Sequence, residues 1–182
     1  ICSGLVGSEM CIRDSSKDRK APAMLQIIRG RIDGHKWIDQ ELIFSVPHEE
    51  YTVSSVHFGA RILFDTEGYL YFSTGDKGVP ENSQDLFSAQ GKIHRLNDDG
   101  SVPKDNPFYN HPTRHKSIYT YGNRNPQGIY QHPETGEIWA TEHGPMGGDE
   151  LNVVRPGLNH GWPIATSVSY THLRAHETAT YL

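Results

Sequence analysis

The sequence predicts an all-β fold, because short runs rich in Ile, Leu, Tyr, Phe and Val alternate with turn residues and no helical period appears. A weak internal repeat is the second observation. Residues 62–76 and 129–143 both read as strand, acidic turn with glycine, strand, then polar residues. One hairpin recurring per unit is typical of β-propeller blades. The pattern alone leaves a β-sandwich as the alternative.

The expected strands follow from the turn residues that separate one apolar run from the next. The first two are the apolar runs 24–32 and 41–46, and the turns 65–68 and 133–136 are each flanked by a pair of runs, as in a hairpin. The turn 97–100 closes another run, and two runs stand alone between polar stretches. The predicted strands are Met24–Ile32, Glu41–Val46, Arg61–Phe64, Tyr69–Thr74, Gly91–Leu96, Ser117–Tyr121, Gly128–Gln131, Glu137–Thr141 and Glu150–Val154.

Two polar stretches between the strands are too long for simple turns. Residues 77–90 and 100–116 are expected to be loops. Long loops in compact domains are often functional. For the second stretch, a surface excursion without a function is an equally good interpretation.

The two ends of the chain share an unusual origin. One DNA string can encode residues 5–15, and its reverse complement, read from the third base, encodes residues 168–177 letter for letter. The string resembles a transposon adaptor used to build sequencing libraries. We therefore expect residues 1–15 and 167–182 to be non-native segments, and residues 16–166 to be a biological fragment truncated at both ends.

The charge of the chain excludes some classes of partner. The formal net charge is −5, and Lys and Arg are scattered without a basic–aromatic patch, so neither nucleic acid nor an anionic membrane is an expected partner. No apolar run approaches the roughly 18 residues that span a bilayer. Cys2 and Cys11 both lie in the first expected non-native segment, so cysteine content says nothing about the redox compartment.

His57 is the first candidate catalytic residue. It stands just before a predicted strand, and histidine is the usual general base near neutral pH. Asp76 follows the next strand, so a hairpin would bring it back towards His57, where a carboxylate can orient the imidazole. Taken singly, each residue also fits a structural role, His57 in a β protein and Asp76 in a glycine-flanked turn.

A second candidate group lies in the loop Gly122–Gly128. Arg124, Asn125 and Gln127 cluster there, and Pro126 biases the preceding residue towards an extended conformation. An arginine with two amides suits a flat ligand with carbonyl and carboxylate groups. A loop hydrogen-bonded to itself is the alternative.

A third candidate is a metal site at residues 142–150. Gly144 and Pro145 offer backbone carbonyls with acidic residues nearby, and Ca²⁺ prefers such oxygens. The neighbouring His143 could suggest zinc, but no second His or Cys stands at ligand spacing. The stretch has no Asp-x-Asp-x-Asp-Gly loop, so it is not an EF-hand.

Taken in order, these motifs resemble the soluble glucose/sorbosone dehydrogenases, also called PQQ-dependent aldose sugar dehydrogenases. The resemblance covers about residues 50–166, and its motifs are specific only as a set. They are His57-Phe-Gly-x-Arg61, Gly68-Tyr-Leu-Tyr71, Gly75-Asp76, Gly91-Lys92, Arg95-Leu96, Asp99-Gly-Ser-x-Pro-Lys-Asp-Asn-Pro107, Tyr121-Gly-Asn-Arg-Asn-Pro-Gln-Gly128, Glu142-His-Gly-Pro145, Gly148-Asp-Glu-Leu-Asn152 and His160-Gly-Trp-Pro163.

The resemblance implies a fold and a reaction. The family fold is a six-bladed β-propeller, of which residues 16–166 would form about two to three blades of the dehydrogenase domain. The family oxidises C1 of an aldose to a lactone and reduces pyrroloquinoline quinone (PQQ) with the help of Ca²⁺. An external electron acceptor and a periplasmic or secreted location are implied as well.

The resemblance also implies roles for the candidate residues. His57 matches the general base, Asp76 the carboxylate that orients it, and Arg124 the residue that stabilises charge on the quinone. The implied cofactor contacts are Arg124, Asn125, Gln127 and His143, although some relatives carry Gln at the last position. Gly144 and Pro145 match carbonyls that hold the metal.

Parts of the family pattern lie beyond this chain. The Lys and Arg pair that binds the cofactor in the family comes from blades after Trp162. We therefore expect the polypeptide as written to be inactive and prone to aggregate, because an incomplete propeller leaves open edges. Two alternatives remain: a non-catalytic propeller of the same family that serves as a binding module, and a Ca²⁺-dependent lactonase propeller, although the loop 124–127 is not typical of the latter.

Overall fold

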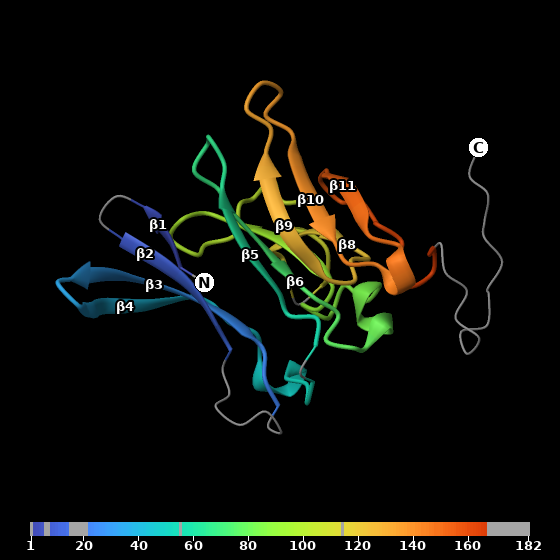
Figure 1. Ribbon diagram of the computed structural model, residues 1–182, viewed down its shortest axis with the longest axis horizontal. Coiled ribbons are helices and arrows are strands. Elements are labelled where there is room, and N and C mark those ends of the chain that lie inside the picture. The colour runs from blue at the N-terminus through green and yellow to red at the C-terminus, as the bar shows by residue number, and fades with distance from the viewer. Residues whose placement is uncertain (1, 6–7, 15–21, 55, 114, 167–182) are drawn as a thin grey trace.

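The chain folds into three antiparallel β-sheets in the computed structural model (Figure 1), which describes residues 2–5, 8–14, 22–54, 56–113 and 115–166. The sheets have the strand orders β1-β2-β3-β4, β5-β6-β7-β8 and β11-β10-β9. The strands are β1 (Cys2–Leu5), β2 (Ser8–Asp14), β3 (Leu25–Asp33), β4 (Lys36–Phe44), β5 (Gly59–Phe64), β6 (Leu70–Thr74), β7 (Lys92–Leu96), β8 (Ile118–Tyr121), β9 (Pro126–Gln131), β10 (Ile138–Glu142) and β11 (Glu150–Val154).

The predicted all-β class and the nine predicted strands are confirmed. Helical structure in the described part of the chain is limited to three short 3₁₀ turns: η1 (His48–Glu50), η2 (Pro80–Ser83) and η3 (Pro145–Gly147). The largest boundary difference is in β4, which begins at Lys36 instead of Glu41, because its first half, with mixed polar and apolar residues, pairs with β3 out to Asp33. The three sheets match the expected two to three blades.

The first sheet includes residues that were predicted to be non-native. β1 and β2 form a hairpin, and β2 pairs antiparallel with β3. This pairing does not bear on where those residues come from, so the boundary at residues 15 and 16 stays a prediction. The boundary at residues 166 and 167 lies at the end of the described residues.

Strand β6 connects two hydrophobic cores. Leu70 and Phe72 face the core shared with the first sheet, whereas Tyr71 faces the core shared with the third sheet. This division follows from the two-residue period of a strand, in which successive side chains point to opposite faces. Since both faces are covered, all five residues of β6 are buried.

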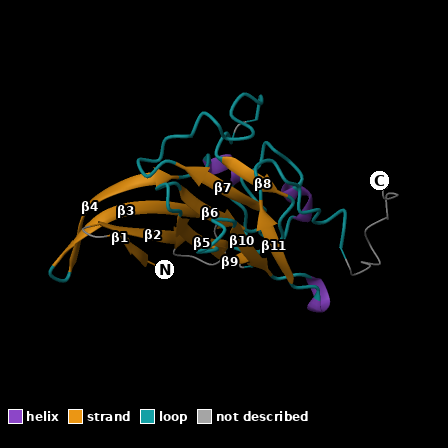
Figure 2. Cartoon of the chain, turned by 90° about the horizontal axis from the view of Figure 1, so that it is seen from above, coloured by secondary structure: helices purple, strands orange, loops and turns teal. Residues whose placement is uncertain are grey.

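The second sheet lies between the first and the third and shares a hydrophobic core with each (Figure 2). Strand β9 of the third sheet lies against β5 and β6 of the second. In Figure 1 the hairpins β5–β6 and β9–β10 therefore project in the same direction. The opposite ends of these strands carry the loops that hold the predicted site residues.

The segment after β11 returns to the middle sheet. Asn159 forms a parallel bridge with Tyr121 at the end of β8, and the N–H of His160 donates to the Tyr121 carbonyl at 2.9 Å. This return places Trp162 beside the loop that follows β6. Among the described residues, no helix has the length and apolar character needed to cross a membrane.

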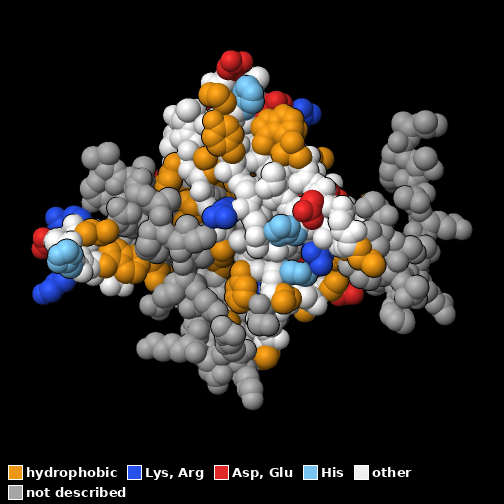
Figure 3. Space-filling model, in the orientation of Figure 1, with side chains coloured by type: hydrophobic (Ala, Val, Ile, Leu, Met, Phe, Trp, Pro, Cys, Tyr) orange, Lys and Arg blue, Asp and Glu red, His pale blue; other side chains and the backbone are white. Residues whose placement is uncertain are grey.

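The surface is chemically mixed. On the face in Figure 3, the described Lys and Arg side chains lie singly among acidic, histidine and uncharged groups. Apolar groups also reach the surface, and the exposed large ones include Ile32, Leu42, Tyr130, Met146 and Leu151.

Candidate active site

The predicted pairing of His57 with Asp76 is present in the structure. The Nδ1 atom of His57 lies 2.6 Å from Oδ1 of Asp76. The hairpin of β5 and β6 brings them together, because Gly59 pairs with Thr74 in its register. Gly75 allows this approach: a Cβ there would lie 2.0 Å from the carbonyl oxygen of His57.

The contacts of Asp76 fix the tautomer of His57. The Asp76 carboxylate is 1% exposed and also accepts the N–H of Gly78 and the indole N–H of Trp162, both at 2.8 Å. A carboxylate that accepts from two donors is an acceptor for the imidazole as well, so Nδ1 of His57 carries the hydrogen. The lone pair of neutral His57 is therefore on Nε2, which makes no hydrogen bond to a described residue.

The backbone around His57 is strained. His57 has a φ of 52° and Lys77, opposite it, has a φ of 55°. Residues other than glycine seldom adopt positive φ, and such strain concentrates at functional sites. The N–H of Lys77 donates to the His57 carbonyl at 3.3 Å, so the two strained residues support each other.

The loop with Arg124 and Asn125 is held by Glu142, at the end of β10. One carboxylate oxygen of Glu142 accepts the backbone N–H groups of Arg124 at 2.7 Å and Asn125 at 3.3 Å. The other oxygen accepts the side-chain amides of Asn123 and Asn152, both at 3.0 Å. Glu142 is 5% exposed, and burial raises its pKa. No sequence pattern indicates this role, because in the sequence Glu142 is only one of several acids near a possible metal site.

Arg124 lies next to the His57–Asp76 pair. Its carbonyl accepts the N–H of Asp76 at 2.8 Å, and its guanidinium lies 5.3 Å from the ring of Trp162. Nη1 donates to the carbonyl of His143 at 3.0 Å. The buried Nε has no partner in the described part of the chain. A buried N–H without a partner is costly, so it marks a place where a ligand oxygen would be stabilised.

Asn125 joins the two predicted groups. Its side-chain oxygen accepts the N–H of Gly59 at 3.0 Å, so it supports the turn after His57. The NH₂ group of Asn125 makes no hydrogen bond to a described residue and is the part of the side chain that a cofactor could use. The structure thus brings His57, Asp76, Arg124 and Asn125 together.

Gln127 and His143 lie together at a neighbouring hollow. Both line a hollow of about 360 Å³ whose lining includes neither His57 nor Arg124. His143 is 57% exposed and its Nδ1 lies 3.5 Å from Asp149. The carbonyl of Gln127 accepts a hydrogen bond from Arg61. Their predicted role as cofactor contacts stays a prediction.

The predicted metal carbonyls fit calcium only in part. The carbonyl of Gly144 lies 3.4 Å from Nη1 of Arg124, and the carbonyl of Pro145 accepts the N–H of Gly148 at 3.0 Å. Ca²⁺ takes six to eight oxygens. Among the described residues no group of three His, Cys, Asp or Glu side chains could hold a metal, and Glu142 is committed to the loop. These two carbonyls could be ligands only together with oxygens from elsewhere.

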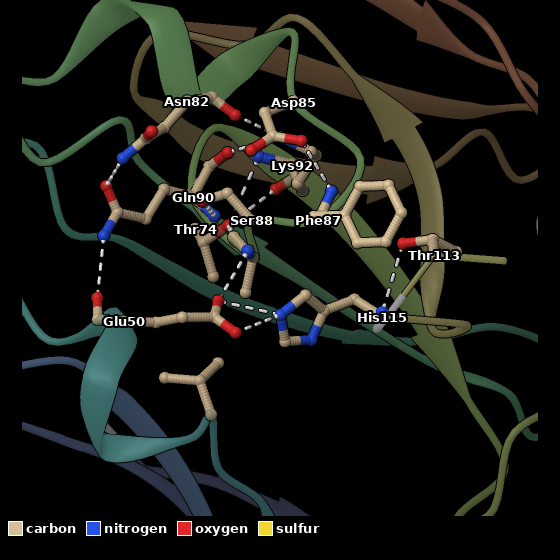
Figure 4. Close-up of polar contacts among 12 residues, drawn as sticks. Glu50, Thr74, Asn82, Asp85, Phe87, Ser88, Gln90, Lys92, Thr113 and His115 are labelled. Carbon is tan, nitrogen blue, oxygen red and sulfur yellow. Dashed lines mark hydrogen bonds and ion pairs between the residues drawn. The ribbon is translucent and has the colours of Figure 1, made fainter.

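A buried polar network supports the loop that carries Asp76 (Figure 4). The ammonium of Lys92, fully buried, donates to the carbonyls of Asn82, Ser83 and Gln90 at 2.6–3.1 Å. Glu50 accepts from Nε2 of His115 at 2.7 Å. Burial lowers the pKa of Lys92 to about 7, while Asp85 and Glu50 act in the opposite direction. Hydrogen bonds to buried side chains therefore hold the long loop that was predicted at residues 77–90.

Comparisons with known proteins agree on one family. The family model described as Glucose / Sorbosone dehydrogenase matches residues 11–181. An aldose sugar dehydrogenase of Escherichia coli is 43% identical over 122 residues, which cover 66% of this chain and 33% of that protein. Quinoprotein glucose dehydrogenase B of Acinetobacter calcoaceticus is 36% identical over 129 residues, which cover 60% of this chain and 26% of that protein.

Solved structures agree. The apo-form of the soluble aldose sugar dehydrogenase of Escherichia coli has a TM-score of 0.80 at 37% identity, covering 87% of this chain and 46% of that one. The PQQ-bound form of an aldose sugar dehydrogenase of Streptomyces coelicolor has a TM-score of 0.71 at 30% identity, covering 87% and 44%. The chain spans between a quarter and a half of the length of these relatives.

Proposed function

Because the chain belongs to the glucose/sorbosone dehydrogenase family, whose fold is a β-propeller, we propose that the whole protein is an aldose dehydrogenase that depends on PQQ and Ca²⁺. It oxidises the C1 alcohol of an aldose to a lactone. The observation that carries the proposal is the hydrogen bond between partly exposed His57 and buried Asp76 beside Arg124. The relative solved with PQQ supports the choice of cofactor.

His57 acts as the general base in this proposal. Its Nε2 takes the proton of the C1 hydroxyl, because the Nδ1–H is held by Asp76 and the lone pair lies on Nε2. The buried carboxylate then stabilises the imidazolium that forms. A bound PQQ would supply the acceptor for the hydride that leaves C1.

Arg124 stabilises negative charge in this proposal. Its guanidinium has a buried Nε without a protein partner among the described residues, so a donor is available for an oxygen that gains charge. Asn125, Gln127 and His143 are proposed as further cofactor contacts. The carbonyls of Gly144 and Pro145 are proposed as two ligands of Ca²⁺, a Lewis acid.

The location, substrate and electron acceptor of the whole protein are proposed from the same family membership. We propose a periplasmic or secreted location, an aldose as substrate and an external electron acceptor. Residues 1–182 alone are proposed to be inactive and prone to aggregate. A soluble monomer of this chain that reduced a dye with sugar, PQQ and Ca²⁺ would contradict this part.

The test is an assay of the full-length protein recovered around residues 16–166. Sugar-dependent dye reduction is measured with and without PQQ and Ca²⁺, for the wild type and for His57→Ala. Activity that requires both additions and is lost in the variant is the expected result. A well-folded protein that neither binds PQQ nor reduces the dye would favour the non-catalytic binding module instead.

A further inference from the structure

We propose that Trp162 is a positioning residue that holds the Asp76 carboxylate and the Arg124 guanidinium in one arrangement. The inference rests on the proposed function, since it concerns the same site. The proposal gives a role to Trp162 of the motif His160-Gly-Trp-Pro163.

The first contact of Trp162 fixes the rotation of Asp76. The indole Nε1–H donates to Oδ2 of Asp76 at 2.8 Å, although the two residues are 86 positions apart. The other oxygen, Oδ1, is shared by Gly78 and His57. With a separate donor on each oxygen, the carboxylate plane is set, and so is the direction in which His57 is held.

The second contact of Trp162 is with Arg124. The guanidinium carbon lies 5.3 Å from the indole ring, within the range of a cation–π interaction. One side chain therefore touches both the carboxylate that orients the base and the cation proposed to stabilise charge.

Trp162 is itself firmly placed. Its N–H donates to the carbonyl of Gly122 at 2.9 Å, and its own carbonyl accepts the Gln84 amide at 2.6 Å. The side chain is 7% exposed, yet it belongs to neither of the two hydrophobic clusters. A tryptophan that only filled space would be expected inside one of them.

The test compares Trp162→Phe with Trp139→Phe in the full-length protein. Trp162→Phe keeps an aromatic face for Arg124 and removes the N–H to Asp76. Trp139 on β10 is a matched control, because its indole N–H is buried without a partner in the described part of the chain. Both variants lose one indole with a buried N–H, although the rest of the Trp139 side chain is only half-buried, and only the first loses a hydrogen bond to Asp76.

We expect Trp162→Phe to lower kcat about tenfold or more with little change in KM for the sugar. The acid limb of its pH–rate profile should move to higher pH, because a carboxylate with one donor fewer attracts the protonated imidazole more strongly. Trp139→Phe should keep the wild-type kcat and profile. If the two variants have the same kcat and pH profile, the proposal is wrong.

Proton NMR of the protein without cofactor gives a readout independent of catalysis. The His57 Nδ1–H in its 2.6 Å bond should give a downfield resonance in the wild type and Trp139→Phe, and a shifted or broadened one in Trp162→Phe. An unchanged resonance would overturn the proposal. If the wild type does not oxidise sugars, the proposed function fails, and this comparison alone decides the role of Trp162.

A second variant covers the case in which Trp162→Phe does not fold. Benzothienylalanine at position 162 has the shape of tryptophan with sulfur in place of the N–H. We expect it to reproduce the kinetic and NMR changes in a folded protein, and wild-type behaviour would overturn the proposal.

Discussion

The imidazole of His57 and the carboxylate of Asp76 are joined by a 2.6 Å hydrogen bond, although the two residues are 19 positions apart in the chain. Asp76 is nearly inaccessible to water, while His57 is 21% exposed. The pair thus has a buried, fixed member and a member that can meet a substrate.

Replacing Asp76 with Asn should lower kcat of the full-length protein by about 10²–10⁴-fold, because an amide can favour the wrong tautomer of His57. Steady-state kinetics with a saturating aldose and PQQ would measure the loss. Asp98→Asn is the control, since Asp98 is exposed in the turn after β7. Equal rates for the two variants would contradict the proposed role of Asp76.

Replacing Glu142 with Gln should loosen the loop that carries Arg124. Each carboxylate oxygen of Glu142 accepts two hydrogen bonds, and glutamine keeps only one acceptor oxygen, so two of the four are lost, at a cost of about 1–3 kcal/mol in the free energy of unfolding. Urea unfolding would measure this cost. Glu137→Gln, whose contact with Arg155 is on the surface, should change stability by less than about 1 kcal/mol.

Acid should destabilise the protein through His94. This residue is fully buried between Phe72, Ser117 and Ala89, and burial lowers its pKa from 6.5 to about 3. Between those pH values the unfolded chain binds a proton that the folded chain does not, so the free energy of unfolding falls as pH decreases. The contribution is on the order of 1.4 kcal/mol per pH unit.

Thermal unfolding of His94→Gln between pH 7 and 4 would check this contribution. The variant should be less stable than wild type at pH 7 but lose less stability on acidification. The exposed His35→Gln should retain the wild-type pH dependence. An unchanged slope in His94→Gln would show that other groups govern acid stability.

Replacing Phe72 with Ala should cost about 3–5 kcal/mol of stability. Phe72 is fully buried, with its ring 4.6 Å from that of Phe44 and 4.7 Å from that of His94. Phe87→Ala is the matched control, because Phe87 is 53% exposed and should lose about 0.5 kcal/mol or less. Chemical denaturation of both variants would decide, and similar midpoints would argue against this packing.

The strands could be predicted because their pattern is local. Alternating apolar residues and glycine turns are visible within ten residues, and the hairpin that joins His57 to Asp76 follows from two adjacent strands. The missed first half of β4 mixes polar residues with Trp37 and Ile38, and its pairing with β3 makes it a strand.

The remaining parts of the site could not be predicted because their contacts are distant in sequence. Trp162 reaches Asp76 across 86 residues, and Glu142 reaches the Arg124 N–H across 18. Neither the residue type nor the sequence spacing of these two side chains predicts which group each one contacts. The burial of Lys92 was likewise invisible, since a lysine in a strand is more often solvent-exposed.

Strand β6 has Leu70 and Phe72 in one core and Tyr71 in the other. A substitution on either face of this strand therefore disturbs a hydrophobic core. A deep mutational scan should therefore find few accepted substitutions along its whole length, without the alternation of tolerant and intolerant positions shown by one-sided strands. In evolution, such a strand would change only together with partners in both neighbouring blades, which links the histories of blades that otherwise could diverge separately.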